Sequence, residues 1–291
     1  MHEKAENLNT FDDIINQEWN KLMEIDAEKS ANKELFPEFI PQLNRFNNTL
    51  PYTYNSIKLG EEKKRYINAS YIYSKEGGTN FIATQGPKQE TIDDFWTMVY
   101  QCDLQVIVML CKLKENNIEK CAKYWDLKTN NFEIKIKEKI INNQDYIINK
   151  LEVKNKSTKE KKSVYHIQYL KWPDFGVPED GKVFDVFREI NKKIDLYNIN
   201  PETNKKYILL VHCTAGVGRT GTFISIYLLE KEIMEQINNK NQNIRFNIFN
   251  LVRKLKEMRV LMVQTKQQYK FIYQFVRYLL EKYSFAPTCY L

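Results

Sequence analysis

The sequence predicts an α/β domain in which several helices pack on a mixed β-sheet. The first half of the chain alternates short apolar runs with turn residues, whereas the second half has long segments of helical periodicity. One almost wholly apolar run, 206–213, lies between two of those helical segments. A buried strand that follows other strands and is flanked by helices is typical of a sheet covered by helices. A chain of 291 residues is long enough to bury the core of such a domain.

The N-terminal segment predicts an amphipathic helix over residues 11–25, because its apolar side chains recur at helical spacing. Thr10 and Asp13 form a pattern that is typical of a helix N-terminus. We expect this helix to pack on the domain rather than to bind a partner. The predicted organisation is an N-terminal helix over residues 1–30, one folded domain over 31–284 and a short tail over 285–291.

The strands and helices of the main domain follow in order. Between residues 66 and 113, short apolar runs alternate with turns and with one helical segment. Residues 124–171 predict a strand meander, and we expect its charged run 154–162 to be an exposed hairpin tip rather than a binding patch. Beyond the meander, helical periodicity predicts helices over 181–197, 219–237, 246–258 and 267–283.

The composition excludes several classes of function. The formal charge is +7, but the lysines are scattered and no arginine–aromatic stripe is present, so we expect no nucleic-acid binding. The five cysteines form no CxxC pair and no Cys/His spacing for a metal, so we expect no metal. Their odd number without a signal peptide favours reduced thiols in the cytoplasm. The longest apolar runs are too short to span a bilayer, so we expect no membrane insertion. We also expect a monomer.

The segment VHCTAGVGRTG, 211–221, has the strongest functional signal. It links the predicted buried strand, ending at His212, to a helix that starts near Arg219. The backbone N–H groups of such a loop and the N-terminus of the helix converge on one point, which makes an anion site. The converging amides come from Thr214, Ala215, Gly216, Val217 and Gly218.

Cys213 distinguishes this loop from a nucleotide-binding loop. The lysine that a nucleotide-binding loop requires is also absent from this segment. A thiol at the centre of converging amides favours the thiolate, which is a strong nucleophile. Arg219 has a planar guanidinium suited to two phosphoryl oxygens, and Thr220 can donate its hydroxyl to the sulfur. His212 either orients the loop through hydrogen bonds or is an ordinary buried histidine. The residues predict a site that both binds and attacks a phosphoryl group.

Together with several separate motifs, this segment resembles the signature loop of the cysteine-dependent protein tyrosine phosphatases. The similarity extends over roughly residues 35–284. It implies a highly twisted mixed β-sheet flanked by helices on both sides, in a single catalytic domain. It also implies hydrolysis of phosphotyrosine in proteins through a phosphocysteine intermediate, without a cofactor.

Two of the motifs resemble loops that act on the leaving group and on water. WPDFGVP, 172–178, resembles the family's acid loop, which implies that Asp174 is the general acid and base and that Trp172 is a hinge residue. VQTKQQYKF, 263–271, resembles the glutamine loop, which implies that Gln264 positions water and that Gln268 supports the loop and the substrate.

Two further motifs resemble loops around the substrate. In NRFNNTLPY, 44–52, which is called the ring loop below, Phe46 would stack on the phosphotyrosine ring in place of the family's usual tyrosine, and Asn48 would hydrogen-bond to the substrate backbone. In the segment 114–125, Glu115 would brace Arg219 and Lys120 would lie near the acid loop.

Three alternatives to a tyrosine phosphatase fit these motifs less well. Shallow-pocket dual-specificity relatives lack the ring, acid and glutamine loops together, and phosphoinositide-specific relatives tend to place lysine inside the signature loop, where this chain has none. A pseudophosphatase that only binds phosphotyrosine is disfavoured, because Cys213, Asp174, Arg219 and Gln264 are all present.

Overall fold

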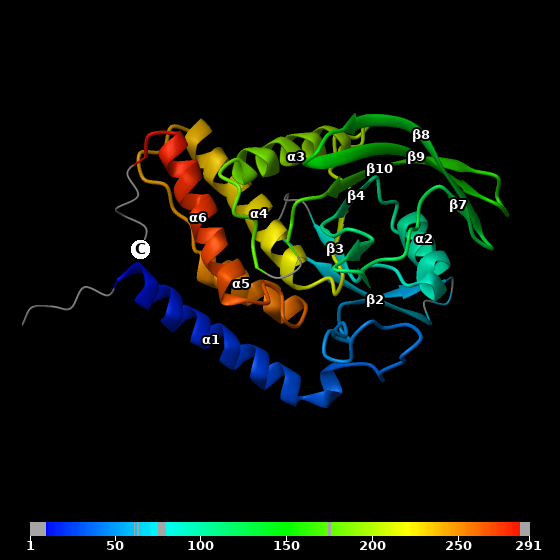
Figure 1. The fold of residues 1–291 in the computed structure, drawn as a ribbon, viewed down its shortest axis with the longest axis horizontal. Helices are drawn as coiled ribbons and strands as arrows, with labels where there is room; N and C mark the ends of the chain where they lie inside the picture. The colour runs from blue at the N-terminus through cyan, green and yellow to red at the C-terminus, as the bar shows by residue number, and fades with distance from the viewer. Residues whose placement is uncertain (1–9, 61, 63, 75–79, 174–175, 286–291) are drawn as a thin grey trace, which may run out of the picture.

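A nine-stranded mixed sheet runs through the centre of the protein in the described residues (Figure 1). The structure is a computed structural model that describes residues 10–60, 62, 64–74, 80–173 and 176–285. The strands are β1 (Ser56–Leu59), β2 (Arg65–Ile72), β3 (Phe81–Thr84), β4 (Val106–Met109), β7 (Leu127–Lys128), β8 (Phe132–Asn142), β9 (Tyr146–Asn155), β10 (Lys161–Tyr169) and β11 (Leu209–His212). Their order is β1-β2-β3-β11-β4-β10-β9-β8-β7. A separate hairpin joins β5 (Lys114–Glu115) to β6 (Ile118–Glu119).

The central strands are parallel and the outer strands are antiparallel. β11 pairs in parallel with both β3 and β4, and β4 pairs in parallel with β10. Helices cover the sheet: α1 (Phe11–Ala31), α2 (Ile92–Gln101), α3 (Val183–Tyr197), α4 (Gly218–Asn238), α5 (Ile248–Met258) and α6 (Lys266–Lys282), with single 3₁₀ turns at Lys33–Leu35 and Gln89–Thr91. None of the helices in the described ranges is long and apolar enough to cross a membrane.

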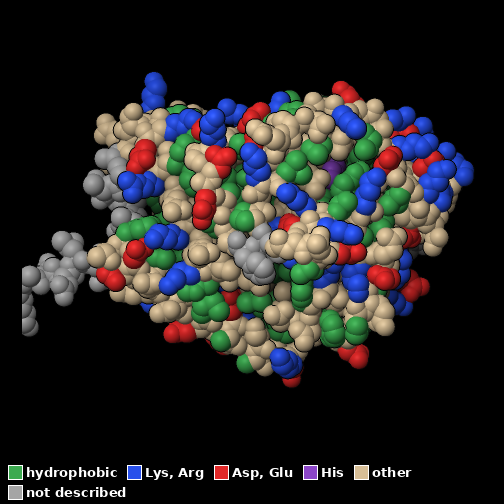
Figure 2. All heavy atoms as spheres, viewed as in Figure 1, with side chains coloured by type: hydrophobic (Ala, Val, Ile, Leu, Met, Phe, Trp, Pro, Cys, Tyr) green, Lys and Arg blue, Asp and Glu red, His purple; other side chains and the backbone are tan. Residues whose placement is uncertain are grey.

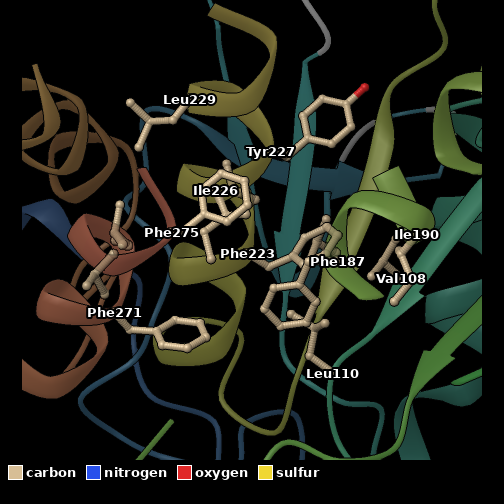
Figure 3. Close-up of a cluster of buried hydrophobic side chains, with 14 of the residues drawn as sticks. Val108, Leu110, Phe187, Ile190, Phe223, Ile226, Tyr227, Leu229, Phe271 and Phe275 are labelled. Carbon is tan, nitrogen blue, oxygen red and sulfur yellow. The ribbon is translucent and has the colours of Figure 1, made fainter. Parts of the chain in front are cut away.

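Each face of the sheet has its own hydrophobic core, because successive strand side chains point to opposite faces. Val106 and Val108 of β4 belong to the core shared with α1 and α3–α6, whereas Ile107 and Met109 belong to the core under α2. Figure 3 shows part of the first core, to which β4 contributes Val108 and α3, α4 and α6 contribute aromatic side chains. Helices therefore flank the mixed sheet on both sides, and the predicted fold class is confirmed.

The first helix is longer than the sequence periodicity indicated. α1 starts at the predicted residue but continues to Ala31, beyond the predicted end at residue 25. At its start, the Asp13 amide donates to the Thr10 hydroxyl at 3.2 Å, and the Thr10 amide donates to the Asp13 carboxylate at 2.9 Å. α1 runs along α5 and α6 (Figure 1), and Trp19 packs on Tyr269 of α6 with ring centroids 5.9 Å apart.

The lysines are less scattered than expected, because most of the positive excess of the chain lies on the strand meander. Residues 127–162 contain ten lysines and five acidic residues. Figure 2 shows these basic side chains gathered at the end of the molecule where β7–β9 lie. The predicted hairpin tip is the turn 156–160 between β9 and β10, so its neighbours 154–155 and 161–162 are strand residues.

Candidate active site

The signature loop, 213–217, lies between the end of β11 and the start of α4. Because β11 has a parallel partner on each side, the loop leaves the sheet from its rigid centre. Gly216 has a φ of +73°, and a Cβ on it would lie 2.1 Å from the carbonyl oxygen of Thr84. Only glycine fits this bend.

The carbonyl groups of the signature loop are held by residues outside it. Gly86 N–H donates to the Thr214 carbonyl at 2.9 Å, and the Arg259 guanidinium donates to the carbonyls of Ala215 at 3.2 Å and Gly216 at 2.9 Å. The C=O and N–H of one peptide unit point in opposite directions, so the following amides face the other side of the loop. Arg259 was not predicted from the sequence. Burial lowers its pKa only to about 10, so the guanidinium is still charged at neutral pH.

The sulfur of Cys213 lies on the side that these amides face. Cys213 is 4% exposed, and its Sγ accepts hydrogen bonds from the Gly216 N–H and from the Thr220 hydroxyl, each at 3.3 Å. Donors that point at a sulfur stabilise negative charge on it. The contact expected for Thr220 is therefore present.

Arg219 forms a bidentate salt bridge with Glu115. Its two terminal nitrogens lie 2.7 Å from the two carboxylate oxygens, and the Leu110 carbonyl accepts a third bond at 3.2 Å. Burial lowers the pKa of Arg219, but the hydrogen bonds that Arg219 donates to Glu115 and its electrostatic interaction with Cys213 outweigh burial, so the pKa is raised overall. The hairpin β5–β6 thus presents Glu115 to the first turn of α4, and the pairing expected from the sequence is present.

The glutamine loop lies against the start of α4. Gln268 is buried, and its Oε1 accepts from the backbone amides of Gln264 at 2.9 Å and Thr265 at 3.3 Å. It therefore caps α6 and holds the backbone of Gln264. The side-chain oxygen of Gln264 lies 3.1 Å from where a Cβ on Gly218 would be, so this side chain reaches the end of the signature loop.

The ring loop is anchored by a residue that the sequence did not indicate. Phe46 is 43% exposed and Asn48 is also exposed, so both are accessible to a ligand. The preceding Arg45 donates to the carbonyls of Gly86 at 2.7 Å and Pro87 at 2.6 Å. The Gly86 N–H also donates to the Thr214 carbonyl of the signature loop, so the segment 86–87 supports both loops.

Three other predicted residues are Asp174 and Trp172 of the acid loop and Lys120 of the segment 114–125. Asp174 lies outside the described residues. Trp172 is buried among aromatic side chains of α3 and α6, and its indole N–H donates to the Gly176 carbonyl at 3.3 Å. Lys120 is half-buried, and its amide donates to the Leu113 carbonyl at 2.8 Å.

His212 belongs to a buried network behind the signature loop. Its Nδ1 lies 3.1 Å from the Cys213 carbonyl, which can only accept, so Nδ1 carries the proton. Its Nε2 then accepts from the Tyr124 hydroxyl at 2.7 Å, and the Tyr124 oxygen accepts from His166 Nε2 at 2.9 Å. Of the two alternatives for His212, these contacts favour orientation of the loop.

We expect His166 to make stability depend on pH. Burial, together with the nearby His212, lowers the pKa of His166 from 6.5 to about 3, so the unfolded chain binds a proton that the folded state excludes. Stability therefore falls as the pH drops from about 6.5 towards 3, by about 2 kcal/mol at pH 5. Urea unfolding at pH 7 and pH 5 measures this loss. The variant His166→Gln, which does not titrate, should lose about 2 kcal/mol less between the two pH values, and an equal loss would contradict the assignment.

Four of the five cysteines lie in the described residues, and Cys289 lies outside them. Cys102, Cys111, Cys121 and Cys213 form no disulfide in the described residues. Over the described ranges, no group of three His, Cys, Asp or Glu residues is arranged to hold a metal ion.

Comparisons with known proteins point to one family. A family model described as protein-tyrosine phosphatase matches residues 40–278. The chain is 38% identical over 255 residues to the human receptor-type tyrosine-protein phosphatase C, a match that covers 83% of this chain and 18% of that protein. It is 37% identical over 245 residues to the tyrosine-protein phosphatase non-receptor type 20 of Rattus norvegicus, covering 82% and 54%. The match thus spans less than a fifth of the first relative and about half of the second.

A solved structure has the same fold. The crystal structure of the catalytic domain of human protein tyrosine phosphatase non-receptor type 18 has a TM-score of 0.79 and 28% sequence identity, and it covers 91% of this chain and 96% of that chain. A second structure, of PTPN18 in complex with HER2 phosphopeptides, has a TM-score of 0.79 and 28% identity, with 91% and 92% covered.

Proposed function

This chain belongs to the protein-tyrosine phosphatase family, and we propose that it hydrolyses phosphotyrosine in proteins through a phosphocysteine intermediate on Cys213. The observation that supports this most strongly is the surroundings of the Cys213 sulfur. Two donors point at it, and the helix that starts beside it carries Arg219, whose fork is oriented by Glu115. A nucleophile and a cation for the phosphoryl oxygens therefore lie at one anion site.

In the first proposed step, the Cys213 thiolate attacks phosphorus. The S–P bond forms as the P–O bond to the tyrosine ring breaks, and Asp174 gives its proton to the departing oxygen. The loop amides of residues 214–218 and the Arg219 guanidinium bind the three equatorial oxygens, on which charge is spread in the transition state.

In the second proposed step, water hydrolyses the phosphocysteine. Gln264 positions the water, and Asp174, now a carboxylate, accepts its proton as the O–P bond forms. The S–P bond breaks, and the sulfur leaves as a thiolate that the Thr220 hydroxyl stabilises. Orthophosphate is released and the enzyme returns to its starting state.

The substrate class follows from the loops around the site. The exposed ring of Phe46 offers a face on which a tyrosine ring can stack, and Asn48 offers an amide for the substrate backbone. We propose that Lys120 and Gln268 support substrate binding and that Trp172 anchors one end of the acid loop. The partners would be phosphotyrosine-containing proteins, with no cofactor required and the chain acting as a monomer.

We further propose that the protein acts in the cytoplasm. The mechanism needs a reduced Cys213, and reducing compartments keep such thiols free. The similar proteins of the non-receptor type support this assignment.

Replacing Asp174 by alanine tests the proposed chemistry. Loss of the acid should lower kcat for a phosphotyrosine peptide by about 10²- to 10⁴-fold, while the peptide still binds with near wild-type affinity. Stopped-flow turnover and a binding titration measure the two quantities. Asp180→Ala, in the segment after the acid loop, is the matched control and should keep the wild-type rate. An equal loss of binding and rate would argue against Asp174 as the acid.

A further inference from the structure

The turn that precedes Gln264 has an unusual backbone. Leu261 and Val263 have φ angles of +59°, in the left-handed region that bulky and β-branched residues rarely adopt. Two such residues within three positions persist only where the surrounding structure holds them. Residues 261–263 are called the left-handed turn below.

A buried ion pair holds both ends of the left-handed turn. Lys256 of α5 is fully buried and Asp26 of α1 is 3% exposed. The Lys256 ammonium donates to one carboxylate oxygen of Asp26, and the other oxygen accepts from the Leu261 amide at 3.2 Å. The same ammonium donates to the Val263 carbonyl at 3.2 Å. Each charged group thus makes one bond to its partner and one to the turn.

The cost of burying this pair argues for a role beyond stability. Burial lowers the pKa of Lys256, and the charge of Asp26 opposes this shift. A buried ion pair can often be replaced by apolar side chains without loss of stability, because desolvation cancels much of the attraction. Apolar side chains could not, however, form hydrogen bonds with the Leu261 amide and the Val263 carbonyl of the turn.

The left-handed turn also contacts the signature loop. The Val263 amide donates to the Val217 carbonyl at 3.3 Å, and a Cβ on Gly221 would lie 2.5 Å from that amide nitrogen. The glycine therefore lets the turn approach the first turn of α4 closely. The next residue is Gln264, whose side chain reaches the position beside Gly218.

We propose that Asp26 and Lys256 are positioning residues for hydrolysis of the phosphocysteine. They hold the left-handed turn, which places Gln264 so that its amide orients the attacking water. This inference rests on the proposed function. It assigns to the N-terminal helix α1 a role in the second chemical step, although no residue of α1 lies in the signature loop.

The step has a distinct kinetic signature. Water attacks phosphorus, the S–P bond breaks, the thiolate of Cys213 leaves, and the proton of the water passes to the carboxylate of Asp174. Release of the phenol occurs earlier, so kcat/KM reports only the events up to that release. A defect in water positioning should therefore lower kcat and KM together and leave kcat/KM unchanged.

The double variant Asp26→Leu/Lys256→Met removes the bonds to the turn without leaving a lone buried charge. With p-nitrophenyl phosphate as the substrate, we expect kcat to fall about tenfold or more and kcat/KM to stay within about twofold of the wild type. Rapid mixing should show a burst of about one p-nitrophenol per active site, because the phosphocysteine accumulates. Gln264→Ala should have the same signature.

The matched control tests whether weaker docking of α1 is by itself enough to cause the kcat defect and the burst. Asp12 and Lys270 form an exposed pair between α1 and α6 that does not contact the turn. The variant Asp12→Ala breaks this pair and leaves Lys270 of the glutamine loop in place, so it should keep wild-type kcat and show no burst. A burst in this control as large as that in the Asp26→Leu/Lys256→Met variant would overturn the proposal, since docking of the helix alone would then explain the effect.

Other outcomes separate this proposal from the proposed function. If the double variant does not fold, as judged by urea unfolding, Asp26→Asn and Lys256→Arg replace it. Asp26→Asn should show the kcat defect. Lys256→Arg keeps the positive charge, so it should have a smaller kcat defect than Asp26→Asn. A folded variant with wild-type kcat and no burst would refute the positioning role. A wild-type protein that does not release p-nitrophenol would instead refute the proposed function.

Discussion

Replacement of Cys213 by serine is expected to abolish turnover of p-nitrophenyl phosphate, with kcat at least about 10⁵-fold below the wild type. The serine hydroxyl occupies nearly the same space as the thiol but gives up its proton far less readily. The donors from Gly216 and Thr220 stabilise a charged sulfur, and they cannot compensate for the much larger cost of forming an alkoxide. Release of p-nitrophenol, followed by absorbance over hours, measures the residual rate.

The same variant should still bind a phosphotyrosine peptide, because the amides and Arg219 that hold the phosphoryl group are unchanged. Cys102→Ser is the matched control, since Cys102 is a half-buried cysteine outside the signature loop, and it should keep the wild-type rate. A Cys213→Ser variant that retains more than about 1% of the wild-type kcat would refute the nucleophile.

Replacement of Arg219 by lysine is expected to lower kcat/KM for the same substrate about 10³-fold. Lysine keeps the positive charge beside Glu115, so no buried carboxylate is left unpaired. A single ammonium cannot, however, make the two parallel bonds to Glu115 and also present a planar fork to two phosphoryl oxygens. Steady-state kinetics and urea unfolding together separate the catalytic loss from any loss of fold.

Two further variants calibrate this result. Arg277 and Glu281 form an exposed pair on α6, and Arg277→Lys should leave both kcat and stability unchanged. Glu115→Gln keeps an oxygen acceptor for Arg219 but removes the charge, so we expect a smaller loss of about tenfold. An Arg219→Lys variant within about threefold of the wild type would contradict the assignment of Arg219 to the transition state.

The parts of the site that could be predicted from the sequence are those whose chemistry requires fixed residues in one continuous stretch. The order of Cys213, Gly216, Arg219 and Thr220 within eight positions follows from a strand, a tight loop and a helix start. A mixed sheet with helices packed on it could be predicted for a similar reason, because apolar periodicity is a local property. That helices flank both faces was implied by the resemblance to the phosphatase family.

The supporting contacts could not be predicted from the residues alone, because they join positions that are far apart in the chain. Arg259 binds the carbonyl of Gly216 from 43 residues away, and Tyr124 reaches His212 across 88 residues. Asp26 looks like one more polar position on an amphipathic helix, yet it is buried against Lys256, 230 residues away. The topology of the fold decides which distant residues meet, and short-range sequence patterns contain no information on these contacts. The division of the chain at residues 30 and 284 stays a prediction.

The most direct test of a phosphocysteine mechanism is to identify the phosphorylated residue during turnover. Gln264→Ala protein should be mixed with p-nitrophenyl phosphate, quenched in acid within the burst, digested, and examined by mass spectrometry. We predict one phosphoryl group on the peptide that contains Cys213, attached to its sulfur and absent when Cys213→Ser is added to the variant. A phosphoryl group on any other residue, or turnover at the wild-type rate with no phosphorylated peptide, would contradict the account.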